Sequence, residues 1–156
     1  MTIEELLDQL PTLPEFQCNP RRVDPAEVSG REAAVGVRLP ADYRRFLLRF
    51  GFASWDGRAV AGIFAGAEAD FPPSYSFAVV EWTARFRSEA EPPFDATLGQ
   101  SVVIGHDQSG GWIALLGDAA GQPGGVVYHH PEDGPDPVQT WPSFTAHLAD
   151  RVRLVP

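Results

Sequence analysis

The chain has 156 residues and a formal net charge of −9, and 44% of its residues are hydrophobic. This length and apolar fraction are typical of one globular domain, so we expect residues 1–156 to form a single domain. The negative charge argues against direct binding to DNA or RNA phosphates, and the lack of lysine excludes lysine-based chemistry such as Schiff bases.

Neither a disulfide framework nor a cysteine-based zinc site is possible, because Cys18 is the only cysteine. The N-terminal residues are acidic and amphipathic, which is unlike a signal peptide. No apolar run reaches the roughly 18 residues that a membrane-spanning helix needs. We therefore expect a cytoplasmic protein that does not insert into membranes.

The N-terminal part predicts two helices joined by a connector. Residues 2–10 have apolar side chains at helical spacing, and Thr2 followed by Glu5 forms a capping box. Residues 13–22 are expected to be an irregular connector. Asp24 and Pro25 then predict the cap and first position of a second helix.

Residues 39–50, LPADYRRFLLRF, predict a helix that docks on the core through one face. Tyr43, Phe46, Leu47 and Phe50 fall at helical spacing i, i+3, i+4 and i+7, and three arginines fall on the opposite side. Gly51 fits the position just past the end of this helix.

The middle of the chain changes from strand to helix. The Asp56-Gly57 pair predicts a turn between two apolar runs, followed by a strand over residues 58–64. Pro72 and Pro73 lie in an expected loop over 66–74. Residues 77–87 then fit a helix.

The remaining sequence predicts an antiparallel meander and a final helix. Three short strands are expected at 101–104, 112–116 and 126–129, with loops at 105–111, 117–125 and 131–137. The last helix is expected over residues 142–154, with an apolar stripe formed by Trp141, Phe144, Leu148 and Val152 and with Thr140 or Ser143 as its cap.

No known catalytic, metal or cofactor motif is present. His129 and His130 are adjacent on a predicted strand, so they point to opposite faces and do not share a metal ion. Ser109 lacks the preceding glycine of a nucleophile elbow. We therefore assign no catalytic residue, metal ligand or cofactor site.

The order of several motifs resembles the SUKH superfamily, the Smi/Knr-type domain. These motifs are LPADYRRFLLRF, IGHDQSGGWIALL, GVVYHH and WPSFTAHL, and the resemblance covers roughly residues 24–154. The resemblance implies an α+β fold with a mostly antiparallel sheet packed against helices. It also implies a protein-binding domain rather than an enzyme, because no catalytic residues come with it. Bacterial members are similar to immunity proteins that neutralise a toxin, and fungal members are regulatory scaffolds.

An acidic inhibitor can occupy the basic active site of a toxin by charge complementarity. The expected loops are 53–57, 105–111 and 131–137, because loops on a rigid sheet carry binding. The candidate partner contacts are Trp55, Asp56, Asp107, Asp118, Glu132, Asp133 and Asp136. Three alternatives stay open: these acids are ordinary solvated turn residues, the domain is a scaffold with several partners, or it is a hydrolase that uses Asp and His of the β-rich half.

Overall fold

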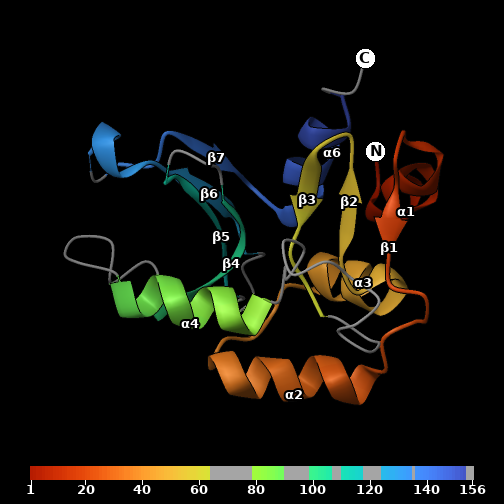
Figure 1. Cartoon of the computed structure of the whole chain (residues 1–156), viewed down its shortest axis with the longest axis horizontal. Coiled ribbons are helices and arrows are strands. Elements are labelled where there is room, and N and C mark those ends of the chain that lie inside the picture. The colour runs from red at the N-terminus through yellow and green to blue at the C-terminus, as the bar shows by residue number, and fades with distance from the viewer. Residues whose placement is uncertain (64–78, 90–98, 107–109, 118–123, 135, 154–156) are drawn as a thin grey trace.

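We describe the fold from a computed structural model of the whole chain (Figure 1), whose described residues are 1–63, 79–89, 99–106, 110–117, 124–134 and 136–153. The helices in this part are α1 (Ile3–Gln9), η1 (Leu10–Thr12), α2 (Pro25–Val35), α3 (Ala41–Phe50), α4 (Val79–Glu89), η4 (Pro131–Asp133) and α6 (Phe144–Arg153). The strands are β1 (Gln17–Cys18), β2 (Ala53–Trp55), β3 (Arg58–Val60), β4 (Ser101–His106), β5 (Trp112–Leu116), β6 (Val126–His129) and β7 (Gln139–Trp141).

The strands form two antiparallel sheets, which confirms the expected α+β class. One sheet has the order β1-β2-β3, and the other has the order β4-β5-β6-β7. Figure 1 shows the four-stranded sheet between α4 and the group formed by the β2–β3 hairpin and α6. The backbone N–H of Ala61, just after β3, donates to the carbonyl oxygen of Ile104 in β4 at 2.8 Å and so joins the two sheets.

The predicted helix starts are confirmed at α1 and α2. Thr2 and Glu5 form a reciprocal capping box at α1. Asp24 caps α2, with Pro25 at its first position. Ser143, one of the two expected caps of the last helix, accepts a hydrogen bond from the backbone N–H of Ala146 at 3.1 Å.

The main core forms around the apolar face of α3, as its spacing predicted. Tyr43, Phe46, Leu47 and Phe50 are all buried. The ring of Phe144 in α6 lies 5.0 Å from that of Tyr43 and 5.4 Å from that of Phe46, between ring centroids. The Tyr43 hydroxyl donates to the carbonyl oxygen of Ala61 at 2.7 Å, and burial raises the pKa of this phenol. The core therefore joins α3, α6 and the end of the hairpin.

A close backbone approach fixes the end of α3. Gly51 has φ of +74°, and a Cβ there would lie 2.5 Å from the carbonyl oxygen of Ile63. A Cβ on Gly62 would collide with the carbonyl oxygen of Gly51. Only glycine satisfies both the positive φ and the close contact at this point.

Several expected boundaries are corrected by strand pairing. The connector 13–22 contains β1, which pairs with β2 through Gln17 and Ser54. Trp141 lies in β7 rather than on the last helix, which begins at Phe144. His106 belongs to β4, and β3 ends at Val60. Most of the expected loop 117–125, all of the loop 66–74 and the first residues of the helix 77–87 lie outside the described residues.

Among the helices that the structure describes, none is long and apolar enough to cross a membrane.

Candidate partner-binding face

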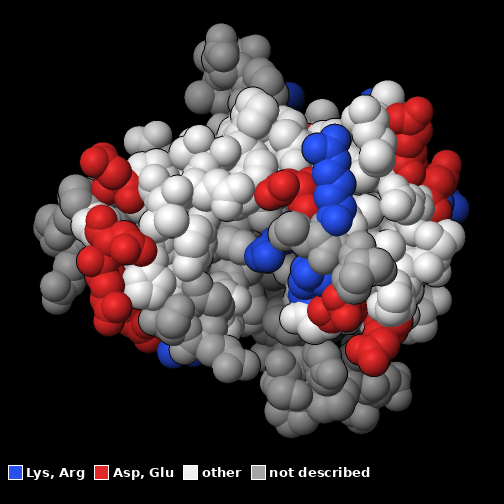
Figure 2. Space-filling model, turned by 90° about the horizontal axis from the view of Figure 1, so that it is seen from above, with Lys and Arg blue, Asp and Glu red and all other residues white. Residues whose placement is uncertain are grey.

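One face of the molecule carries two of the three loops expected to bind a partner (Figure 2). We call it the upper face and define it by the β2–β3 turn, η4 and the C-terminal half of α6. Figure 2 shows acidic side chains at both sides of this face, and arginine side chains with further acidic groups near its middle, beside a recess.

Glu132, Asp133 and Asp136, which we call the acidic loop, are exposed between β6 and β7. The short helix η4 holds the first two, and His130 caps it by accepting a hydrogen bond from the backbone N–H of Glu132 at 3.3 Å. The Asp133 carboxylate lies 3.8 Å from the Nδ1 atom of His130. The loop connects β6 and β7, which pair with each other, so the two strands fix the position of the acidic residues.

Asp56 is exposed at the turn between β2 and β3. Its φ of +44° and the φ of +71° at Gly57 are typical of a type I′ hairpin turn. The Asp56 carboxylate forms an ion pair with Arg58 at 2.5 Å, and its backbone N–H donates to the carbonyl oxygen of Pro14 at 3.2 Å. The turn is therefore anchored on both sides.

Trp55 does not lie exposed on a loop, and that part of the expectation is wrong. It is in β2 with 1% of its surface exposed, in the main core. The three-residue strand β2 is buried along its whole length because β1 and β3 flank it. Asp107 and Asp118 lie outside the described residues.

The histidines of the β-rich half pack against neighbouring side chains. His129 in β6 stacks on its cross-strand neighbour Trp112 at 4.6 Å between ring centroids. Burial lowers the pKa of His129, and the charge of Asp136 partly offsets this effect. His106 lies against Trp82 of α4 at 4.3 Å. Within the part of the chain that the structure describes, no three His, Cys, Asp or Glu side chains group so as to hold a metal ion.

The sequence analysis does not anticipate an electrostatic influence between two distant arginines. The charge of Arg58 of β3 lowers the pKa of Arg151 of α6. Burial is the larger cause of this shift, whereas Asp150 and Tyr128 act in the opposite direction. The two arginines are 93 positions apart (151 − 58), so no local pattern brings them together.

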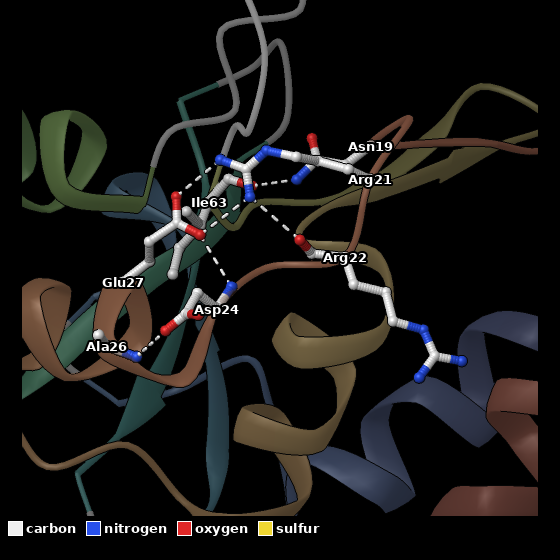
Figure 3. Close-up of polar contacts among 7 residues, drawn as sticks. All are labelled: Asn19, Arg21, Arg22, Asp24, Ala26, Glu27 and Ile63. Atoms are coloured by element: carbon white, nitrogen blue, oxygen red, sulfur yellow. Dashed lines mark hydrogen bonds and ion pairs between the residues drawn. The ribbon is translucent and has the colours of Figure 1, made fainter.

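A second cluster of charged groups fixes the start of α2 (Figure 3). Arg21 donates from both Nη atoms to the Glu27 carboxylate at 3.1 and 3.0 Å. Glu27 also accepts from the backbone N–H of Asp24 at 2.8 Å. The bond from Arg21 is the main reason that the pKa of Glu27 falls to about 2, and the bond from Asp24 adds to it. The groups in this cluster satisfy one another, which indicates a structural role.

Comparison with known families finds one match. The sequence model described as the SMI1 / KNR4 family (SUKH-1) matches residues 22–150. No curated protein matches the chain. The matched range runs from the residues before α2 into α6, and it includes both the acidic loop and the β2–β3 hairpin.

Proposed function

The chain belongs to the SMI1 / KNR4 family (SUKH-1), and from this premise we propose that it is a protein-binding domain that inhibits a cognate toxin. Residues 1–156 act as one binding unit, without a cofactor and without catalysis of their own. The inhibitor covers the active site of the toxin with its upper face. The alternative role within the binding class is a scaffold that engages several partners.

The observation that carries this proposal is the acidic loop at the end of the four-stranded sheet. Its three carboxylates are exposed. Glu132 and Asp133 lie in η4, and the paired strands β6 and β7 flank the loop. A toxin that acts on nucleic acid has a cleft suited to phosphates, and such a cleft attracts carboxylates. The net charge of −9 adds a long-range attraction for the same basic partner.

The exposure of each remaining candidate side chain decides whether we propose it as a partner contact. Asp56 lies on the same face, at the tip of the hairpin. Trp55 supports this turn from beneath and does not reach the partner, because it is buried. Asp107 and Asp118 stay predicted contacts.

The first test is capture of partners by the tagged protein from the lysate of its native host, at low and moderate salt. One stoichiometric partner with toxic activity that the protein blocks supports the inhibitor. Several weak partners support the scaffold instead. Capture of no protein at either salt contradicts both binding functions.

A matched pair of variants then tests the acidic loop. Glu132→Gln with Asp133→Asn removes two charges from the loop, and Glu81→Gln with Glu89→Gln removes two exposed charges from α4. We expect the first variant to associate with the partner on the order of tenfold more slowly at low salt, because charges at an interface steer encounter. Equal effects of the two variants would exclude the acidic loop as the contact.

A further inference from the structure

We propose that the outer edge of β7 binds an extended, positively charged segment of the partner protein as an additional strand of the four-stranded sheet. We call residues 138–141 the open edge. This inference rests on the proposed function and deepens it, because it names a backbone surface and the kind of segment that the partner brings to it.

The strand β7 lies at one end of the four-stranded sheet. It follows β6 in the order β4-β5-β6-β7, and Figure 1 shows it at the end opposite β4. Just before β7, the backbone N–H of Val138 donates to the carbonyl oxygen of Tyr128 in β6 at 2.8 Å, which extends the pairing by one residue. Within the part of the chain that the structure describes, no strand pairs with the other side of β7.

The outer side of the open edge offers backbone groups for hydrogen bonding. Alternate residues of an edge strand point their N–H and C=O groups away from the neighbouring strand. Apart from the pairing with β6, residues 138–141 make no backbone hydrogen bond with the residues that the structure describes. Gln139 and Thr140 are exposed and Trp141 is half-buried, so a partner can reach this edge.

The other strand edges of the described structure are less suitable. The N–H of Ala61, directly after β3, donates to the carbonyl oxygen of Ile104 in β4, so the facing edges of β3 and β4 are partly occupied. The strand β1, at the end of the other sheet, has only two residues.

Val138 adds an apolar contact to the open edge. Its surface is 49% exposed, and Met1 is the only other large hydrophobic residue of the described chain that is exposed to solvent. On the same strand, the side chains of Gln139 and Trp141 donate to Asp150 of α6 at 3.4 and 3.2 Å and hold β7 in place. An added strand can therefore bury Val138 without moving β7, because side chains of neighbouring strands pack in pairs.

Two prolines limit the length of the open edge. Pro137 directly precedes it and Pro142 directly follows it. Proline has no backbone N–H and interrupts strand pairing. The edge therefore accepts a segment of about four residues, and the prolines restrict uncontrolled association of edges.

The charges around the open edge favour a basic segment. The acidic loop leads directly into it, with Glu132, Asp133 and Asp136 exposed. Arginine or lysine side chains on an added strand can pair with these carboxylates, and an acidic segment is repelled. A second copy of this chain is a poor occupant for the same reason, because pairing of two β7 strands brings together two chains with a net charge of −9 each.

The test is an NMR titration of the full chain with the synthetic peptide acetyl-RVRVRV-amide, followed through the backbone amide signals. We expect saturable shifts that are concentrated at residues 138–141 and in the acidic loop. The matched control is the same peptide methylated at every backbone nitrogen, which keeps the side chains and the charge but has no N–H to donate. It should bind on the order of tenfold more weakly, because an added strand is held by its backbone hydrogen bonds.

Two results of this titration would overturn the proposal. Equal affinities of the two peptides, or shifts that lie mainly elsewhere in the chain, would show that the open edge does not add a strand. Binding of acetyl-EVEVEV-amide as tight as that of the basic peptide would overturn the choice of a positively charged segment.

A matched pair of protein variants tests the open edge itself. Val138→Lys places a positive charge on the edge, and Ala33→Lys places the same charge on the exposed side of α2. We expect only the first variant to weaken binding of the basic peptide, on the order of tenfold, because like charges repel and the apolar contact is lost. Equal effects of the two variants would contradict the site. If Val138→Lys unfolds the chain, the comparison of the two peptides decides alone.

The occupant is tested on the protein by itself and with the captured partner. Sedimentation of the full chain should show a monomer, and a dimer that Val138→Lys dissociates would overturn the choice of a partner. Val138→Lys should also weaken binding of a captured partner more than Ala33→Lys does. Equal binding of the two variants contradicts the added strand and leaves the proposed inhibitor intact, whereas failure of the capture experiment leaves the peptide titration valid.

Discussion

His147 is a buried histidine that the fold keeps uncharged. Its ring packs edge-on against Trp141 at 4.6 Å between centroids, and its Nδ1 atom has no partner in the described part of the chain. Burial in the first place, and the charge of Arg151 in addition, lower its pKa from 6.5 to about 3. A residue of this kind links the stability of the domain to pH.

We expect His147 to destabilise the native state as the pH falls from about 6.5 to about 3. Within this window the unfolded state binds a proton that the native state does not, so the free energy of unfolding falls by up to about 1.4 kcal/mol per pH unit. Above the window both states are neutral and the contribution vanishes. Denaturant unfolding of the wild type and His147→Leu at several pH values checks this, and identical slopes for the two proteins would refute it.

Phe46 lies at the centre of the aromatic core, where it contacts the rings of Phe50 and Phe144. It is completely buried, so Phe46→Ala should lower the free energy of unfolding by about 3–5 kcal/mol, as large aromatic truncations do. Arg45→Ala, on the exposed side of α3, is the control and should change stability by less than about 1 kcal/mol. A loss below about 1 kcal/mol for Phe46→Ala would mean that this face does not form the core.

At the scale of elements, the ends of the helices depend on a few local bonds. In α2 the Asp24 carboxylate accepts from the backbone N–H of Ala26 at 2.7 Å, and Glu27 reaches back to the backbone N–H of Asp24. Asp24→Ala should therefore lower the free energy of unfolding by about 0.5–2 kcal/mol. Ser29→Ala, exposed within the same helix, should cost less, and equal losses in chemical denaturation would count against the cap.

These helix starts were predictable because the cap and its partner are three residues apart. Two short strands, β1 and β7, were not predictable, because they are defined by pairing with other strands and not by nearby residues. The two-residue β1 pairs with β2, more than thirty positions later, and the three-residue β7 is defined by its register with β6. Neither is long enough to show the alternation that identifies a strand. The spacing between Trp141 and Phe144 fits helical periodicity equally well, so the sequence pattern predicts Trp141 on the last helix.

At the scale of the whole molecule, the formal net charge is −9. Figure 2 shows acidic groups at both sides of the upper face, and acidic groups and arginines together near its middle. Long-range attraction of a basic partner depends on the overall charge, and salt screens this attraction over about 10 Å.

The association rate with the partner should therefore fall as salt rises. We expect the rate to drop on the order of tenfold between about 0.05 and 0.5 M NaCl, because steering weakens with ionic strength. The dissociation rate should change less. Stopped-flow or surface-based kinetics measure both rates, and a salt-independent association rate would contradict electrostatic steering.

The sequence by itself determined the caps of α1 and α2, the buried face of α3 and the acidic residues of the loop before β7, and the family resemblance implied the α+β class. Each of these depends on residues within a few positions of one another, or on the period of one element. Only the tertiary structure decided that Trp55 is buried in the main core and that the charge of Arg58 influences Arg151. The physical reason is that burial and charge proximity depend on which distant segments pack together, and helical or strand periodicity describes only one segment at a time.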